Sequence, residues 1–256
     1  MTQIALAPLL AAVTALMRAG RWTTATELLR AATASTPSDS LALAAAMAEV
    51  TVDQDFSQQT DNAGPALVVL EKALAETPDA TTSWDLAFLH LKKDYGTALS
   101  TGDRTAGEAY AKRAAELHAT APDEARSGYA AFYEGVIADN LQELPAAAFT
   151  AYNTALELGE RSADDLLISL ALRHLGDHAH TAGDLVLARA QWERSTELRQ
   201  KAGHLLGALA QQALLAVLAR DEGNPEASRA LATEVNRWSH QVHIPFLQTQ
   251  TAALLT

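Results

Sequence analysis

The sequence repeats itself, and this self-similarity limits the fold more than any other feature. In three segments an alanine is followed four residues later by a large apolar residue, and three residues after that by a small one. Repeats of about 40 residues are typical of folds that stack one supersecondary unit on the next, because a single unit cannot bury its own apolar face. The triplets are Ala66/Leu70/Ala73, Ala148/Tyr152/Ala155 and Ala188/Trp192/Ser195.

The turns between the expected helices repeat as well. Gly183-Asp184-Leu185 and Gly223-Asn224-Pro225 follow one another at a spacing of about 40 residues, the period of the triplets. Glycine after a helix and proline at the start of the next one are the usual punctuation of helical hairpins. The repeating unit is therefore predicted to be a pair of antiparallel helices.

The composition agrees with an all-α fold. Hydrophobic residues make up 48% of the chain but aromatic residues only 5%, and alanine is the commonest residue type. Alanine has the highest helix propensity and lets helix axes approach closely. A β-sandwich or barrel needs more β-branched and aromatic residues than this chain supplies.

The chain resembles the tetratricopeptide repeat (TPR) family over most of its length, and the match is closest between residues 169 and 200. The resemblance implies a right-handed α-solenoid in which the first helix of each pair lines a concave surface and the second faces outward. It also implies that small residues let the two helices of a pair touch while a large aromatic residue fills the gap beside them. The matching residues are Leu175-Gly176, Ala179, Gly183, Leu185, Ala188 and Trp192.

We expect one domain over residues 1–256, built from about six helix pairs and a C-terminal capping helix. Pro65, Pro145 and Pro225 mark helix starts, where the missing N–H is harmless. The pairs are predicted near 4–35, 39–77, 81–119, 123–158, 162–201 and 203–241, with the cap at 246–255.

One predicted turn is longer than the others. Residues 52–64 carry Asp53, Asp55 and Asp61 and separate two helices of a single pair. A solvated loop is the simpler interpretation, and a contribution to a binding site at one rim is the alternative.

Candidate binding residues follow from the face that each first helix turns toward the concave surface, at about 100° per residue. That face combines both signs of charge with aromatic rings, as ligand sites often do. The competing interpretation is a solvated helix face whose ion pairs contribute little. The candidates are Asp85, Lys92, Tyr129, Phe132, Asp139, Asn140, Arg173, Asp177 and His180.

The resemblance does not extend to the peptide-carboxylate clamp of many TPR domains, which uses lysine and asparagine on successive first helices. Binding of chaperone tails is therefore not implied. The corresponding positions are Asp85, Phe132 and Arg173, followed by Leu89, Val136 and Asp177.

Two histidines allow a metal hypothesis. His174 and His178 lie one helical turn apart, a spacing that can share a metal ion. No glutamate accompanies them as a catalytic zinc motif requires, so helix packing or hydrogen bonding is the favoured interpretation. The sequence also has no phosphate-binding glycine loop and no nucleophile elbow. We expect no metal, no cofactor and no catalytic residue, although an enzyme is not excluded.

The net charge and the absence of cysteine limit the classes of partner and the cellular compartment that we expect. A net charge of −12 repels phosphate, which argues against nucleic acid and anionic membranes as partners. The absence of cysteine is compatible with a reducing cytoplasm. The apolar N-terminal stretch lacks a preceding basic region, so we interpret it as a structural helix instead of a signal peptide.

These observations favour a non-catalytic, cytoplasmic scaffold that binds a segment of a partner protein in its concave groove. One alternative is a small-molecule sensor or enzyme with a polar and aromatic pocket on the same surface. A second is a regulatory module of a transcription-related protein, although no basic recognition helix is apparent. A homodimer formed through an end face is compatible with all three, because solenoid ends expose apolar surface.

Overall fold

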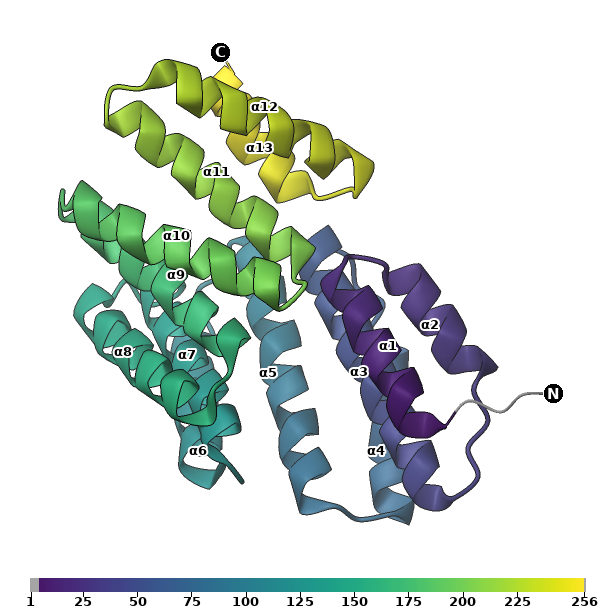
Figure 1. Ribbon diagram of the computed structural model, residues 1–256. Coiled ribbons are helices and arrows are strands. Elements are labelled where there is room, and N and C mark those ends of the chain that lie inside the picture. Colours follow the sequence, from purple (N-terminus) through teal and green to yellow (C-terminus); the bar gives the residue numbers. More distant parts are fainter. Residues whose placement is uncertain (1–4, 256) are drawn as a thin grey trace. The chain divides into compact units, whose positions relative to one another are not determined.

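The computed structural model describes residues 5–255, and this part of the chain is entirely helical (Figure 1). Within it thirteen α-helices follow one another without a strand, as the repeat pattern predicts. The helices are α1 (Leu6–Arg18), α2 (Trp22–Ala31), α3 (Pro37–Gln58), α4 (Gly64–Glu76), α5 (Ala80–Thr101), α6 (Gly107–Thr120), α7 (Glu124–Asn140), α8 (Pro145–Ser162), α9 (Asp165–Thr181), α10 (Leu185–Lys201), α11 (Leu205–Asp221), α12 (Pro225–Gln241) and α13 (Pro245–Leu255).

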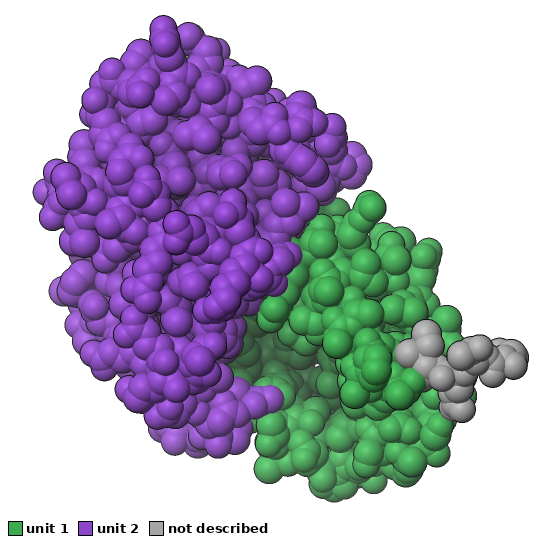
Figure 2. Space-filling model, viewed as in Figure 1, with its two compact units in different colours: residues 1–113 green, residues 114–256 purple. Residues whose placement is uncertain are grey.

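The chain divides into two compact units, which Figure 2 distinguishes by colour. The first ends at Arg113 and the second begins at Ala114, so the boundary falls inside α6. Within α1–α5 and within α7–α13 each helix packs against the next helix in sequence, and α3, α5, α9 and α13 also contact the helix two places earlier. This succession of neighbour contacts is the packing expected of a helical repeat.

The start predicted for the N-terminal helix cannot be compared with the structure at every residue. Helix α1 starts at Leu6, and residue 4, where the sequence predicts its start, lies outside the described residues. Val13 and Met17 on α1 are buried, so the apolar stretch serves packing as interpreted from the sequence. No helix within residues 5–255 is both long enough and apolar enough to cross a bilayer.

The expected long turn at residues 52–64 is largely helical, which corrects the sequence prediction. Helix α3 continues to Gln58 because Val52 and Asp55 extend its buried face, and it ends where Gln59 adopts a left-handed conformation with φ 56° and ψ 46°. Only residues 59–63 connect α3 to α4.

Asp55 organises this short connection. Its carboxylate accepts hydrogen bonds from the hydroxyl of Thr60 at 2.6 Å, from the backbone N–H of Asn62 at 2.8 and 2.9 Å, and from that of Ala63 at 2.7 Å. Backbone donors that precede a helix need such acceptors because they have no partner within it. Asp55 therefore has a structural role in the turn.

Helices α9, α10 and α11 are each followed by a left-handed glycine, and the residue after that glycine caps the next helix. Gly183, Gly203 and Gly223 take φ values of 83°, 69° and 82°, and each directly follows the C-cap residue of α9, α10 or α11. Glycine reaches this left-handed region without the steric cost that other residues carry. The next residue in each case, Asp184, His204 or Asn224, accepts a backbone hydrogen bond in the first turn of the following helix.

Small residues in the second unit make room for two large aromatic side chains, Tyr152 and Trp192, which are buried to 0 and 1% exposure. A β-carbon added at Gly135 would lie 2.5 Å from the Tyr152 ring, and one added at Gly176 would lie 2.4 Å from the Trp192 ring. The expected close contact between paired helices, with an aromatic residue filling the gap, is confirmed for α9 and α10 at these positions.

Candidate functional site

The nine candidate residues divide between the two units. Asp85 and Lys92 lie on α5 in the first unit. The other seven lie on α7 and α9 in the second unit and are Tyr129, Phe132, Asp139, Asn140, Arg173, Asp177 and His180.

Lys92 belongs to a charged cluster in the first unit. Glu49 and Asp53 on α3 lie within electrostatic range of Lys92, and Asp85 acts on Glu49 as well. Burial raises the pKa of Asp53, while Lys92 and a 2.7 Å hydrogen bond from the Trp22 indole N–H lower it. The opposing charges compensate one another locally, so Lys92 helps to stabilise Glu49 and Asp53, two acids that the sequence analysis did not place beside it.

The centre of the second unit is an aromatic cluster contributed by three helices. Phe132 on α7 is 6% exposed and packs against Tyr152 on α8 and His174 on α9, with ring centroids 6.0 and 5.4 Å away. Phe132 was expected to project into a groove. Because the rings of α8 and α9 cover it, it instead forms part of the packed support beneath the more exposed side chains.

Asp139 joins this cluster through hydrogen bonds. Its Oδ2 atom accepts a hydrogen bond from the Tyr152 hydroxyl at 3.0 Å and lies 3.1 Å from Nε2 of His178. The side chains of Asp139 and His178 are about one-fifth exposed. One carboxylate oxygen therefore connects α7, α8 and α9.

Arg173 and Asp177 are brought together on α9, as their spacing predicts. Nη1 of Arg173 lies 3.5 Å from Oδ2 of Asp177, and the two side chains are 27 and 40% exposed. The backbone carbonyl of Arg173 accepts a 2.8 Å hydrogen bond from the Trp192 indole. Burial raises the pKa of Asp177, and the positive charge of Arg173 opposes this rise.

His180 lies beyond this pair and faces another helix. Its Nε2 atom is 2.9 Å from Oδ2 of Asp221 at the end of α11, and its ring packs 5.4 Å from that of Trp192. At the other end of the candidate set, the Tyr129 hydroxyl contacts Oδ1 of Asp164 at 3.4 Å. Asn140, the last residue of α7, is partly exposed.

The two histidines of the metal hypothesis are engaged in other contacts. His174 stacks on Tyr152, and His178 pairs with Asp139. Burial, together with the positive charges of Arg173 and Arg199, lowers the pKa of His174 well below its ordinary value. Among residues 5–255 no group of three or more histidine, cysteine, aspartate or glutamate side chains has an arrangement suited to a metal ion.

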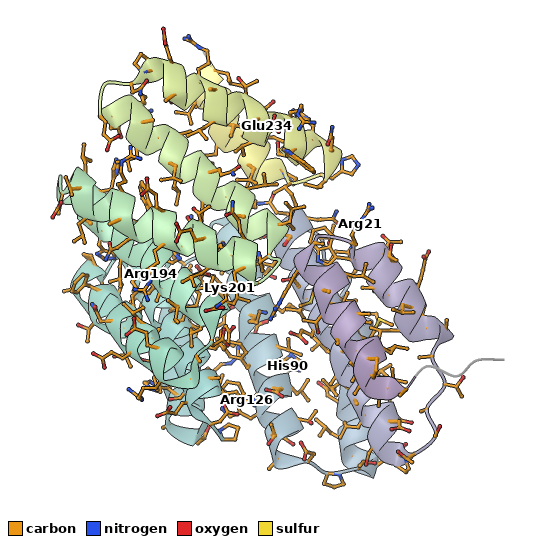
Figure 3. All side chains as sticks on the ribbon, in the orientation of Figure 1. Arg21, His90, Arg126, Arg194, Lys201 and Glu234 are labelled. Carbon is orange, nitrogen blue, oxygen red and sulfur yellow. The ribbon has the colours of Figure 1, made fainter. Side chains whose placement is uncertain are left out.

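Sequence reasoning did not include Arg199, a buried arginine with 4% exposure on α10. A signal for it was present: Ala188, Trp192, Ser195 and Arg199 recur at spacings of four, three and four, so a charged residue continues the buried stripe of the helix. Arg194 and Lys201, the two residues of α10 labelled in Figure 3, are instead 52 and 70% exposed. Arg199 is the exception on this helix.

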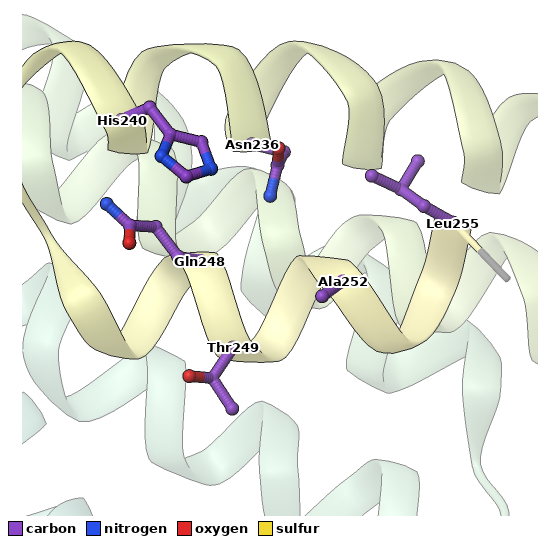
Figure 4. Close-up of a pocket in the computed structure, with 6 residues that line it drawn as sticks. All are labelled: Asn236, His240, Gln248, Thr249, Ala252 and Leu255. Carbon is purple, nitrogen blue, oxygen red and sulfur yellow. The ribbon is translucent and has the colours of Figure 1, made fainter.

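A surface hollow of about 650 Å³ lies between α12 and α13 (Figure 4). It contains none of the candidate residues, and the hydrogen bond from Asn236 to the Thr251 hydroxyl, 2.9 Å long, ties the two helices together at its edge. Its lining residues are Asn236, His240, Gln248, Thr249, Ala252 and Leu255.

Comparison with known proteins finds no matching family model and no matching curated protein.

Proposed function

We propose that this chain is a non-catalytic protein of the TPR type, a right-handed α-solenoid that binds a segment of a partner protein along the first helices of its pairs. The cytoplasm is the proposed location. The observation that carries the proposal is the Arg173–Asp177 pair, which is partly exposed and held on a packed support.

The support is rigid for identifiable reasons. Trp192 is nearly fully buried, and its indole fixes the backbone at Arg173 through a hydrogen bond. Tyr152 and Phe132 fill the layer below α9 with ring-to-ring contacts. Side chains that extend from a packed surface lose less conformational entropy on binding than side chains of a mobile loop, so the pair is pre-organised for recognition.

The chemistry of the polar groups favours binding over catalysis. A segment that carries both an acidic and a basic residue could pair with Arg173 and Asp177 together, since these offer opposite charges 3.5 Å apart. The Tyr152–Asp139–His178 arrangement superficially resembles an acid–base set. The Tyr152 hydroxyl, however, belongs to a side chain with 0% exposure, which keeps a substrate from reaching it.

The test is capture of partner proteins from cells that express the chain naturally. Wild-type chain and an Arg173→Ala/Asp177→Ala variant are compared by quantitative mass spectrometry. We expect a specific partner to be depleted at least tenfold with the variant. Arg194→Ala is the matched control, because Arg194 is about half exposed on α10 and its 3.3 Å ion pair with Glu160 lies outside the candidate set.

The control should retain the partner at the wild-type level. If the double variant retains every partner that the wild type captures, and circular dichroism shows that it is folded, the Arg173–Asp177 surface is not the binding site. Cross-linking of the captured partner to α7 or α9 would locate the contact directly.

A further inference from the structure

Arg199 is a buried charge that has no counter-ion among residues 5–255. Its side chain reaches from α10 toward α11, where a β-carbon added at Gly207 would lie 2.4 Å from its Nη1 atom. Its Nε and Nη2 atoms are buried and have no hydrogen-bond partner among the described residues. A buried guanidinium normally has a carboxylate or another acceptor for such donors, because desolvating an unpaired charge costs several kcal/mol.

The groups around Arg199 add positive potential and do not neutralise the charge of its guanidinium. Arg173 is the charged neighbour that acts on it, and the carboxylate of Asp165 is engaged by Lys201 at 2.7 Å. Gly207 lies in the first turn of α11, where the helix dipole contributes a partial positive charge. Burial and the charge of Arg173 lower the pKa of Arg199 to about 9, which still leaves the guanidinium protonated at neutral pH.

Polar groups continue along the same helix interface. One turn before Arg199, the Ser195 hydroxyl donates a 2.6 Å hydrogen bond to the backbone carbonyl of Ser169 and accepts one from the Gln211 amide. Helix α10 packs against both α9 and α11.

We propose that Arg199, supported by Arg173, binds a small oxyanion, namely a phosphate or carboxylate group of a small-molecule ligand, among α9, α10 and α11. Both groups suit a guanidinium, which presents paired N–H donors in a planar fork. A small ligand is favoured because Arg199 is only 4% exposed, which leaves no room for a peptide chain to lie across it. This inference shares Arg173 with the partner-binding role proposed above, but its test changes Arg199 and leaves Arg173 and Asp177 in place.

Thermal unfolding of the full chain provides the test. The melting temperature is measured at neutral pH in sodium phosphate, sodium acetate and sodium chloride of equal ionic strength. A ligand that binds only the folded state raises the melting temperature, and we expect phosphate, acetate or both to raise it by about 2–4 °C above chloride. Comparing the two oxyanions separates phosphate recognition from carboxylate recognition.

Arg199→Met distinguishes binding from packing. Methionine preserves much of the apolar stem while removing the unpaired charge, so the variant should be as stable as the wild type in chloride, or more stable. It should also lose the oxyanion-dependent rise. Arg194→Met on the same helix is the matched control and should keep that rise, since Arg194 is exposed and paired with Glu160.

A second variant protects the test against misfolding of the first. Arg199→Lys keeps the positive charge but lacks the planar fork, and we expect it to lose at least half of the oxyanion-dependent rise. The proposal is overturned if neither oxyanion stabilises the wild type more than chloride does. It is also overturned if the folded Arg199 variants respond to phosphate and acetate as the wild type does.

Discussion

The imidazole of His174 stacks on the ring of Tyr152, with the ring centroids 4.7 Å apart and an interplanar angle of 18°. Nη1 of Arg173 lies 3.3 Å from Nε2 of the same imidazole. Positive charge on His174 would face Arg173 and Arg199 inside a partly apolar environment, so the folded protein favours the neutral ring.

This relationship predicts acid sensitivity. The unfolded chain protonates His174 below about pH 6.5, whereas the folded chain, in which the pKa is lowered, does not. The unfolded state then binds more protons, and the contribution of His174 to the free energy of unfolding falls as the pH drops from about 6.5 toward the folded pKa. Urea denaturation at pH 7.5 and 5.5 should therefore show a smaller loss of stability for His174→Phe than for the wild type. An equal loss in both proteins would contradict the neutral-ring assignment, and His240→Phe on α12 controls for removal of an imidazole.

Asp55 should be important for the stability of the first unit. Asp55→Ala removes the acceptor for the N–H groups of Asn62 and Ala63, and we expect the free energy of unfolding to fall by about 2–3 kcal/mol. Chemical denaturation monitored by circular dichroism measures this change. Asp61→Asn is the control: Asp61 pairs with Lys93 at 2.9 Å but is 82% exposed, so its loss should cost less than about 0.5 kcal/mol. Similar effects of the two substitutions would show that the connection does not depend on Asp55.

Gly176 should not tolerate a side chain. In Gly176→Ala the new methyl group would overlap the Trp192 ring, and we expect a loss of about 1–3 kcal/mol. Thermal unfolding measures the change. Gly64→Ala should instead be neutral or stabilising by about 0.5 kcal/mol, because no atom lies within 4 Å of a β-carbon built there and its φ is not in the left-handed region. If Gly176→Ala is as stable as the wild type, the close contact between α9 and α10 is not required.

The hydrogen bond between Gln211 and Ser195 should respond unequally to changes in its two partners. Ser195→Ala removes the donor to Ser169 and leaves the buried amide of Gln211 without its acceptor, at a cost of about 1–3 kcal/mol. Gln211→Met removes a carbonyl oxygen that is buried and unpaired in the wild type, so it should be close to neutral. Urea denaturation of both variants tests the asymmetry, and a larger loss for Gln211→Met than for Ser195→Ala would refute it.

The helix boundaries could be predicted largely from sequence because their signals are local. Helix α10 ends at Lys201, where the fifth predicted pair ends, and Pro145 and Pro225 begin α8 and α12. Glycine and proline act within one or two residues of the place where the backbone turns, so their effect is visible without the rest of the fold. The end of α3 was predicted too early because an aspartate such as Asp55 is typical of loops. Its role as acceptor for the N–H groups of Asn62 and Ala63 is visible only in the structure.

The candidate site was harder to predict, because burial depends on neighbouring helices. Phe132 lies on a helix that is buried around most of its circumference, so periodicity alone could not show that Tyr152 and His174 cover it. Spacing along a single helix correctly placed Arg173 beside Asp177, since residues four apart lie on one face.

By itself, then, the sequence determined an all-helical chain with paired helices and small residues where those pairs touch, because propensity and periodicity are encoded over a few residues at a time. Only the tertiary structure decided that Arg199 is enclosed by Gly207 of α11 and the α9 face near Arg173 without an acidic partner. The electrostatic environment of a side chain is the sum over charges and dipoles from several helices, and no single segment contains that sum.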